Sequence, residues 1–407
     1  MASSQSPRAR HSAMSQHRHP VLRGLLLVSV FLFLFVVTLG ALVYADANSW
    51  SKKVDVSSLL GKDEERPDTP KEENPTDSYA GKDLNIVLIA SDHRDNVEYD
   101  ERGYKITGMR SDATLVMHIA ADRKRIDIIS IPRDTMVKRP ECKNSAGKVF
   151  PASTQLGMFN DSFALAGGEN DVAAAAACTI KTVEGMSNVY VDQFVVVDFA
   201  GFKGVIDALG GVNMCLDKAV HDRKNTVNLP AGCQKLDSEQ ALGYARARYG
   251  LGDGSDLSRI GRQQQLLGAI MKEALSKNYL TDLPSLYSFL RAGMKSLTMS
   301  EEFGSVTTLG GLALSMSGID PSKINFYMLP VEDYPYNRAK VIPAPAAEGV
   351  WEAIRSDKPL AATVKGTNID GKEAKPVEPP ATATESNPDS VGITPTPSAP
   401  PGTSTGN

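Results

Sequence analysis

An unbroken run of uncharged, mostly apolar residues near the start of the chain constrains its architecture most. Residues 24–44 read GLLLVSVFLFLFVVTLGALVY. A helix of this length crosses the roughly 30 Å hydrocarbon layer of a membrane. The arginines that precede the run favour a cytoplasmic N-terminus; they are Arg8, Arg10, Arg18 and Arg23. We therefore expect a cytoplasmic segment 1–23, a single-pass anchor at 24–44, and the rest of the chain outside the cytoplasm.

A cleaved signal peptide is the alternative reading of this segment. Ala45-Asp46-Ala47 resembles the small-residue site of a signal peptidase. Signal peptides usually carry an apolar region of only about 7–15 residues. The longer run therefore favours an anchor that is kept in the cell membrane.

Composition divides the exported part into three segments. Residues 45–82 are rich in charge and proline, which is typical of an extracytoplasmic linker. Residues 359–407 are rich in proline, threonine and serine, and such a tail buries too little apolar surface to fold. The folded domain is expected between them, at 83–358. The formal net charge of −4 argues against nucleic acid as a partner.

Short apolar runs and longer amphipathic stretches alternate within the folded domain. Strands are expected at Leu84–Ala90, Thr114–Ala120, Ile126–Ile131, Val189–Val197 and Ile324–Leu329. Helices are expected at Asp171–Met186, Phe199–Leu209, Ser238–Ala245, Leu257–Lys277, Leu283–Met294 and Glu302–Met316. This order predicts an α/β fold, a three-layer-like sandwich in which helices flank a central mixed β-sheet.

Four cysteines lie in the exported part, without the close paired spacing of a zinc site. An oxidising compartment allows two disulfides, and sequence leaves three connectivities open. We favour pairing between sequence neighbours, Cys142–Cys178 and Cys215–Cys233, over buried free thiols.

Two acidic residues stand at the ends of expected strands. Asp92 follows LNIVLIAS, and Asp112 precedes LVMHIA. Strand ends in α/β folds open into clefts, and carboxylates suit Mg²⁺ or another divalent cation. The alternative is that each carboxylate forms a surface ion pair, Asp92 with Arg94 and Asp112 with Arg110.

Arginines are grouped at three places in the domain. Arg133 follows the strand IDIISI, YARAR contains Arg246 and Arg248, and DLSRIGRQQQ opens a helix with Asp256 as a plausible N-cap. Arg259, Arg262 and Gln263 can share one face of that helix. Guanidinium groups match phosphate oxygens and keep their charge, so their convergence would hold a diphosphate. Each of them alone is more often solvated or paired in a salt bridge.

The sequence lacks GxSxG, HExxH and P-loop motifs. No covalent catalyst is therefore evident, which suits direct displacement at phosphorus.

The motifs as a set resemble the LytR-CpsA-Psr family of cell-wall glycopolymer transferases. They are, in chain order, ASDHR, RSDAT, SIPRD, FNDSFALAGG, DFAGFKGVIDALGGV, LDSEQALGYARAR and DLSRIGRQQQ. The similarity is strongest from Asp83 to Lys277. Departures from the family pattern are Ala90, where a glycine is common, and Asp161-Ser162, which follow Asn160.

The resemblance implies an apolar pocket for a polyprenyl chain, with a mouth that binds its diphosphate. By motif position, Asp92 and Asp112 would hold Mg²⁺, and Arg110 and Arg133 would contact phosphates. The remaining phosphate-binding positions would be Arg246, Arg248, Arg259, Arg262 and Gln263, with Asp256 orienting the arginines. The residues implied to carry catalysis are Arg133, Arg246, Arg248, Asp256 and Arg259.

The implied reaction moves a glycan from a polyprenyl-diphosphate carrier to a cell-wall hydroxyl and releases polyprenyl phosphate. The acceptor would be the muramic acid C6 hydroxyl of peptidoglycan or, alternatively, a glycoprotein. Asp134 is a candidate general base, although a salt bridge or a turn cap explains it equally well. A diphosphatase side activity would use the same residues. The alternative function is a non-catalytic protein of the envelope that binds polyprenyl lipid or has a regulatory role.

Overall fold

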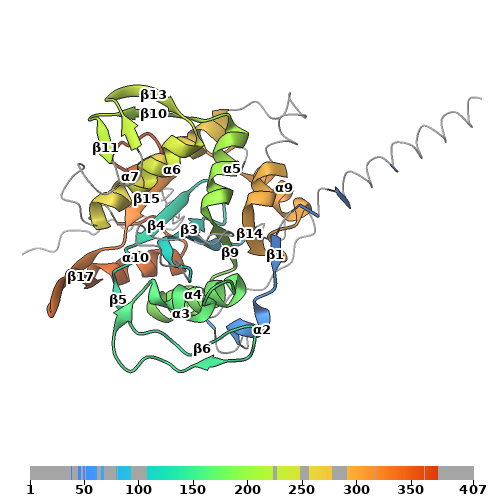
Figure 1. Cartoon of the computed structure of the whole chain (residues 1–407), viewed down its shortest axis with the longest axis vertical. Coiled ribbons are helices and arrows are strands. Elements are labelled where there is room, and N and C mark those ends of the chain that lie inside the picture. The colour runs from blue at the N-terminus through green and yellow to red at the C-terminus, as the bar shows by residue number, and fades with distance from the viewer. Residues whose placement is uncertain are drawn as a thin grey trace, which may run out of the picture.

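The computed structural model is built around a mixed β-sheet (Figure 1). It describes residues 81–92, 108–222, 227–247, 256–276, 291–316, 318–361 and 363–374, together with 52–61 and isolated positions before residue 81. The sheet has eight strands, in the spatial order β1 (Lys52–Val54), β14 (Leu297–Ser300), β9 (Gln193–Val197), β2 (Leu84–Ser91), β3 (Ser111–Ile119), β4 (Ile126–Ile131), β15 (Ile324–Met328) and β18 (Gly366–Asn368). The pairs β1–β14, β2–β9 and β4–β15 are parallel and the others antiparallel.

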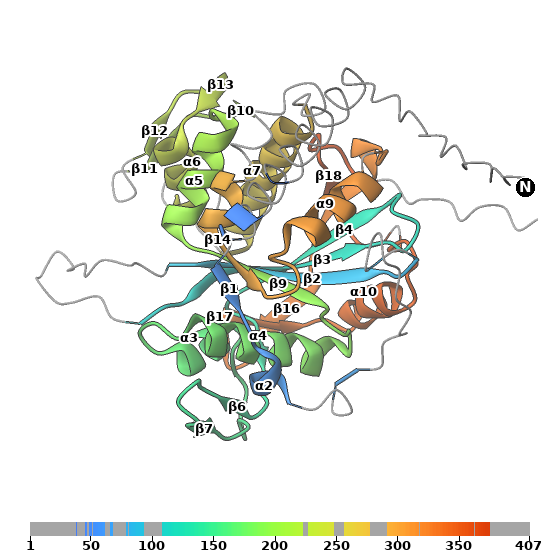
Figure 2. The ribbon, with the colours of Figure 1, turned by 90° about the vertical axis from the view of Figure 1, so that its right-hand side faces the viewer.

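Helices cover both faces of the sheet, which gives the three layers seen in Figure 2. One face packs on α2 (Ser57–Leu60), α3 (Asp161–Gly167), α4 (Val172–Ser187) and α10 (Ala346–Arg355). Val87 and Ile89 of β2 point into this layer, because alternate residues of a strand face the same side. Asp171 caps α4, and a run of alanines (173–177) makes its buried surface flat enough for close packing.

The opposite face of the sheet packs on α7 (Asp256–Ser276) and α9 (Val306–Ser315). Beyond it, α5 (Phe199–Leu209), α6 (Ser238–Arg246) and α7 enclose a third apolar cluster. Two hairpins close that cluster; their strands are β10 (Val212–Leu216) with β13 (Gly232–Leu236), and β11 (Val220–Asp222) with β12 (Val227–Leu229). The mixed sheet with flanking helices agrees with the predicted fold class.

Smaller elements decorate the sandwich. They are β5 (Met136–Val137) with β8 (Gly157–Met158), β6 (Cys142–Lys143) with β7 (Val149–Phe150), β16 (Val331–Tyr334) with β17 (Asn337–Pro343), and the 3₁₀ turn η2 (Pro321–Lys323). Two disulfides link Cys142 to Cys178 and Cys215 to Cys233, which confirms the expected pairing. The first joins β6 to α4, and the second joins directly opposed residues of β10 and β13.

The ordered structure extends beyond both expected ends of the folded domain. Residues expected in the linker form β1 and α2, where Val56 and Leu60 are buried in the core. Residues beyond 358 form β18, and Leu360 and Ile369 are buried. A few buried apolar residues fix these two segments to the domain. Their polar neighbours dominate the composition, so composition alone predicted a linker and a tail there.

Two expected elements lie largely outside the described residues. The anchor at 24–44 is one of them, and the helix Leu283–Met294 is the other. Within the described part of the chain, no helix combines the length and the apolar character that crossing a membrane requires.

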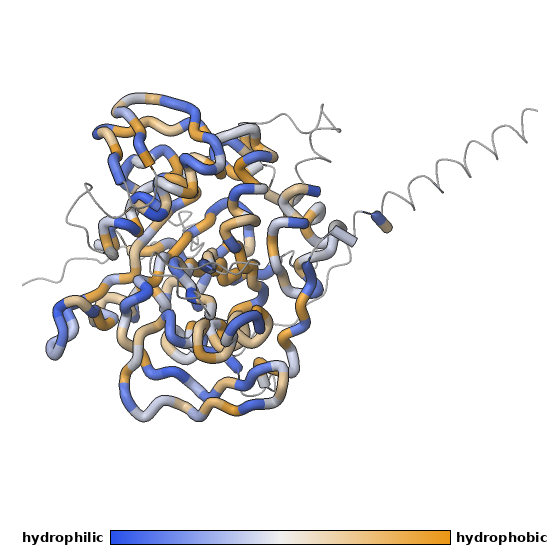
Figure 3. The backbone as a smooth tube through the Cα atoms, in the orientation of Figure 1, coloured by the Kyte–Doolittle hydropathy of each residue, from blue (hydrophilic) through white to orange (hydrophobic). Residues whose placement is uncertain are grey.

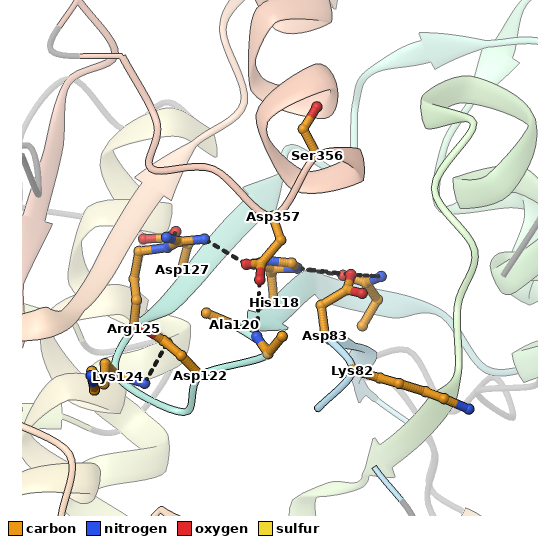
Figure 4. A network of polar contacts seen from close by, with 12 residues as sticks. Lys82, Asp83, His118, Ala120, Asp122, Lys124, Arg125, Asp127, Ser356 and Asp357 are labelled. Carbon is orange, nitrogen blue, oxygen red and sulfur yellow. Dashed lines mark hydrogen bonds and ion pairs between the residues drawn. The ribbon is translucent and has the colours of Figure 1, made fainter. Parts of the chain in front are cut away.

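A closed network of charged and polar side chains ties the sheet to α10 (Figure 4). His118 of β3 is fully buried; its Nδ1 lies 2.8 Å from Asn85 Oδ1 and its Nε2 lies 3.0 Å from Asp357 Oδ1. Arg125 spans Asp127 and Asp357, at 2.8 Å in each case. Burial raises the pKa of Asp127, and the nearby Arg125 opposes that shift. Every group here has a partner within the protein, so the network is structural.

Candidate functional site

A cavity of about 620 Å³ lies between the sheet and the helices α5, α6 and α7. Its floor comes from the sheet face that carries Leu88, Leu115, Val195, Val197 and Leu297. Its walls are apolar side chains of the three helices: Phe202, Val205, Leu242, Leu266, Leu267 and Ile270. The polar residues of the lining are Ser91, Asp92, Arg110, Asp112, Arg133, Asp198, Arg246, Arg259, Gln263 and Gln264. The cavity thus combines an apolar lining with a cluster of charges.

The antiparallel pairing of β2, β3 and β4 brings three of these charges to one edge of the sheet. Asp92 follows the end of β2, Asp112 lies at the start of β3, and Arg133 follows the end of β4. The backbone N–H of Arg110 donates to Asp92 Oδ1 at 2.6 Å, and that of Asp92 donates to the Arg110 carbonyl at 3.0 Å. These bonds fix the Asp92 carboxylate at the rim of the cavity.

Arg133 is held between two carboxylates. Its Nη1 lies 3.1 Å from Asp112 Oδ1, and its Nε lies 3.7 Å from Asp134 Oδ2. Lys340 of β17 contacts the other Asp134 oxygen at 2.8 Å. Asp112 therefore pairs with Arg133, not with Arg110. Asp134 does not line the cavity, and its two carboxylate oxygens lie near Arg133 and Lys340, which places it to position Arg133 through a salt bridge.

Arg246 ends α6 and faces the cavity. Its guanidinium carbon lies 4.6 Å from the centre of the Phe199 ring, a cation–π contact. Phe199 opens α5, and the Asp198 side chain caps this helix by accepting from Gly201 N at 2.6 Å. Arg246 is the last residue of α6, which begins at Ser238.

The helix α7 supplies further polar groups to the cavity. Arg262, which was expected to bind phosphate, does not line the cavity. Arg259, Gln263 and Gln264 line the cavity. Arg262 is buried outside it and donates from Nη2 to the Ala247 carbonyl at 2.7 Å. Arg262 thereby fixes the chain just after α6, which supports Arg246 without reaching the ligand space.

A buried tyrosine links α6 to α7. The Tyr244 hydroxyl donates to Gln265 Oε1 at 2.7 Å, and burial raises the pKa of Tyr244 to about 12. Its hydroxyl therefore remains a neutral donor at physiological pH, which keeps the two helices that carry Arg246 and Arg259 in register.

Seven of the expected site residues line the one cavity: Asp92, Arg110, Asp112, Arg133, Arg246, Arg259 and Gln263. Arg248 and the side chain of Asp256 lie outside the described residues; the backbone of Asp256 begins α7. Asn160 is buried, and its N–H donates to the Arg133 carbonyl at 3.2 Å.

Four residues of the site were not expected from sequence. Asp198 and Phe199 open the motif DFAGFKGVIDALGGV, and their place in that motif was the available signal. Gln264 follows Gln263 and donates to Ser130 Oγ at 2.8 Å. Lys340 lies in no motif, and nothing in the sequence connects it to Asp134.

The donor set suits a divalent cation with few protein ligands. No group of three or more His, Cys, Asp or Glu side chains with metal-binding potential occurs among the residues that the structure describes. Asp92 and Asp112 nevertheless line the same cavity beside several arginines. Magnesium commonly uses one or two carboxylates and completes its shell with water and substrate phosphates. The two residues therefore fit this ion and do not form a closed structural site.

Comparison with known proteins identifies the family. The model of the LytR_cpsA_psr family matches residues 46–355. The chain belongs to the LytR-CpsA-Psr family. This confirms the resemblance seen in the motifs, and the matched range contains every residue that lines the cavity.

Three relatives within the LytR-CpsA-Psr family illustrate the extent of the similarity. LcpA of Corynebacterium glutamicum, a cell wall biosynthesis protein, is 27% identical over 60% of this chain and 49% of its own length, so the chain spans about half of that relative. The polyisoprenyl-teichoic acid–peptidoglycan teichoic acid transferase TagT of Bacillus subtilis is 28% identical over 74% of this chain and 86% of its own. A solved structure of TagT bound to LIIa-WTA shares the fold, with a TM-score of 0.51, 22% identity, and coverage of 75% and 98%.

Proposed function

We propose that this protein is a phosphotransferase that moves a glycan from a polyprenyl-diphosphate carrier to a cell-wall acceptor hydroxyl. The observation that carries the proposal is the cavity, because one space joins an apolar lining to Asp92, Asp112, Arg133 and Arg246. A lipid diphosphate has the same two parts, a hydrocarbon chain and a compact cluster of negative charge. The names of TagT and its relatives, which act on teichoic acid and peptidoglycan, support the same class of reaction.

The positions of the arginines support direct displacement at phosphorus. Arg133 and Arg246 hold the diphosphate while the acceptor hydroxyl attacks the sugar-linked phosphorus. A phosphodiester forms, the bond from that phosphorus to polyprenyl phosphate breaks, and the proton of the acceptor hydroxyl passes to the released polyprenyl phosphate or to solvent. Arginines that are fixed before the reaction stabilise the charge that develops on the phosphoryl oxygens and on the leaving phosphate. The acceptor we favour is the C6 hydroxyl of muramic acid in peptidoglycan.

A magnesium ion held by Asp92 and Asp112 belongs to the proposal. When bound, it would neutralise charge on the phosphate oxygens. Removing divalent ions with a chelator is expected to stop transfer, and added Mg²⁺ is expected to restore it. Asp112→Asn is expected to require more Mg²⁺ for half-maximal rate than wild type. Full activity of chelated wild-type protein would contradict the role of the metal.

The proposed place of action is the outer side of the cell membrane, with the uncharged run 24–44 as a single-pass anchor. Fractionation of cells that make the full chain, followed by protease treatment of intact cells without their wall, tests both parts. The chain is expected in the membrane fraction, with the domain accessible to the protease. A soluble chain or a protected domain would contradict this placement.

A transfer assay with two arginine variants tests the activity. Both arginines lie over an aromatic ring, but Arg246 lines the cavity, whereas Arg291 lies 5.6 Å from the Trp50 ring and outside the cavity. Full-length protein is supplied with a polyprenyl-diphosphate-linked glycan, Mg²⁺ and peptidoglycan fragments. Arg246→Ala is expected to slow transfer about 10²–10³-fold, as loss of a transition-state donor does, and Arg291→Ala is expected to have no effect. Equal rates for both variants would overturn the proposal.

The same assay separates a transferase from a binder of polyprenyl lipid. A non-catalytic protein needs the apolar lining alone, so it would bind the donor and form no product. Product analysis also separates transfer from diphosphate hydrolysis, because only transfer places the glycan phosphate on peptidoglycan.

A further inference from the structure

The β16–β17 hairpin forms an arm that projects from the body of the domain, seen at the left of Figure 1. Its base contacts the residues that directly follow Arg133, at the charged edge of the cavity. Thr135 and Val341 form a parallel bridge, and the N–H of Val341 donates to the Asp134 carbonyl at 3.4 Å. The Lys340 ammonium binds Asp134, which contacts Arg133. A continuous set of contacts therefore joins the arm to an arginine that lines the cavity.

The tip of the arm presents two aromatic side chains. The rings of Tyr334 and Tyr336 lie edge to face, with centroids 5.4 Å apart, and Tyr336 is 89% exposed. The flanking residues Glu332, Asp333, Asn337 and Arg338 are polar and exposed, and Figure 3 shows the arm as mostly hydrophilic. Tyr336 is the most exposed of the large hydrophobic residues in the described part of the chain.

This chemistry suits a sugar chain. One face of a pyranose ring consists of C–H groups that pack against an aromatic ring, while the hydroxyl groups at its edge need polar partners. Tyrosine offers an apolar ring face together with a polar hydroxyl. Lys340 in β17 follows Tyr336 by four residues, which corresponds to about 13 Å of extended chain. A glycan strand of a few rings covers that distance between the tip and the base of the arm.

We propose that the β16–β17 arm binds the glycan strand of the acceptor and directs it toward the cavity. This inference rests on the proposed transferase function and adds the position of its second substrate. The occupant follows from the sugar-binding chemistry of the tip and from continuity with the site, because Lys340 at the base of the arm contacts Asp134, which contacts Arg133 of the cavity.

Binding to insoluble peptidoglycan, free of attached protein and without any lipid donor, tests the arm directly. The Tyr334→Ala/Tyr336→Ala double variant is expected to bind about tenfold more weakly than wild type, because two ring contacts are lost. The Phe double variant retains the rings and is expected to bind nearly as wild type. Leu275→Ala removes a large exposed side chain on α7 and serves as the matched control.

Steady-state transfer by the same proteins provides the second readout. The KM for peptidoglycan fragments is expected to rise about tenfold in the Ala double variant, while the KM for the lipid donor stays unchanged. Unchanged peptidoglycan binding, or a change in donor KM alone, would overturn the inference. If wild type transfers nothing but its peptidoglycan binding still requires the two rings, the transferase proposal fails and the arm remains a glycan-binding surface.

Discussion

The same two strands carry a charged cluster at each of their ends, and the two clusters have different surroundings. At one end of β3 and β4, Asp112 and Arg133 line the cavity, with side chains 31% and 20% exposed. At the other end, His118 and Asp127 are directly paired in register and have side-chain exposures of 0% and 1%. Antiparallel pairing creates both clusters from the same strands, but only the first adjoins a space for a ligand.

The cluster at the cavity end is suited to binding a ligand, and the buried cluster is suited to stabilising the fold. In the buried network of Figure 4, charges are compensated by Arg125, Asp357 and amide groups inside the protein. The cavity lining carries four arginines and three carboxylates, and this excess of positive charge favours an added anion; the residues are Arg110, Arg133, Arg246 and Arg259, with Asp92, Asp112 and Asp198. Substitutions in the two clusters are therefore expected to have opposite consequences for stability and activity.

The largest effect is expected in the buried network. Arg125→Met removes the cation that contacts Asp127 and Asp357. Breaking a buried pair leaves an uncompensated charge, which typically costs about 3–5 kcal/mol of unfolding free energy. Urea denaturation measures this loss. Lys272→Met breaks the exposed pair with Asp370 and is expected to cost at most about 1 kcal/mol. Similar losses for both variants would refute the contrast between buried and exposed pairs.

The next effect concerns the cavity end of the same strands. Arg133→Ala is expected to lower kcat/KM for transfer about 10²–10³-fold, because a guanidinium that stabilises developing phosphate charge is lost. Its urea midpoint is expected to stay close to that of wild type. Lys203→Met, which breaks an exposed pair with Glu239 outside the cavity, is the control. A large loss of stability in Arg133→Ala would place this arginine with the structural network.

A smaller effect is expected where the arm meets the cavity. Lys340→Met leaves Asp134 with Arg133 as its neighbouring cation and removes the contact that fixes its carboxylate. A partly exposed pair is worth about 1 kcal/mol, so kcat/KM is expected to fall about fivefold. Calorimetry of lipid-donor binding separates two explanations for the lower rate. A variant with a misplaced Arg133 still binds the donor, whereas a variant that fails to fold does not. A loss as complete as that of Arg133→Ala would contradict an indirect role for Lys340.

The smallest effect is a change in acid sensitivity. The pKa of Asp357 lies below its ordinary value. Partial burial acts to raise this pKa, but two kinds of interaction outweigh burial: hydrogen bonds from His118 and Ala121, and the charges of His118 and Arg125. Asp357 therefore stabilises the fold above the ordinary carboxylate pKa of about 4, and this contribution is lost as pH falls through the lowered pKa.

Asp357→Asn is a suitable test because asparagine tolerates the left-handed backbone at φ 49°. The substitution is expected to cost about 1 kcal/mol at pH 7 and progressively less below pH 4. Urea midpoints at several pH values measure this. A cost that does not change with pH would show that the charge of Asp357 has no part in it.

Sequence predicted the central sheet well because its strands are continuous apolar runs. The expected Ile126–Ile131 strand is β4 itself, and the expected Phe199–Leu209 helix is α5. The charges at the ends of β2, β3 and β4 could also be anticipated, since strand ends in a sheet of this kind meet at its edges. Local pattern was sufficient for these features.

Features that depend on contacts between distant segments could not be anticipated. Helical spacing placed Arg262 with Arg259, but packing against Ala247 turns it away from the cavity. The Lys340–Asp134 pair joins residues 206 positions apart, and no local pattern encodes it. The cation–π contact of Arg246 with Phe199 likewise depends on how α5 and α6 pack. Such contacts complete the site after the fold has formed.

In the proposed function, one cavity holds both the hydrocarbon chain and the diphosphate of a polyprenyl lipid, and a crystal structure of the protein with a polyprenyl diphosphate is the decisive experiment. We expect the diphosphate beside Asp112, Arg133 and Arg246, and the hydrocarbon chain between the sheet and α5, α6 and α7. A lipid bound on any other surface, with this cavity containing only solvent, would contradict the account.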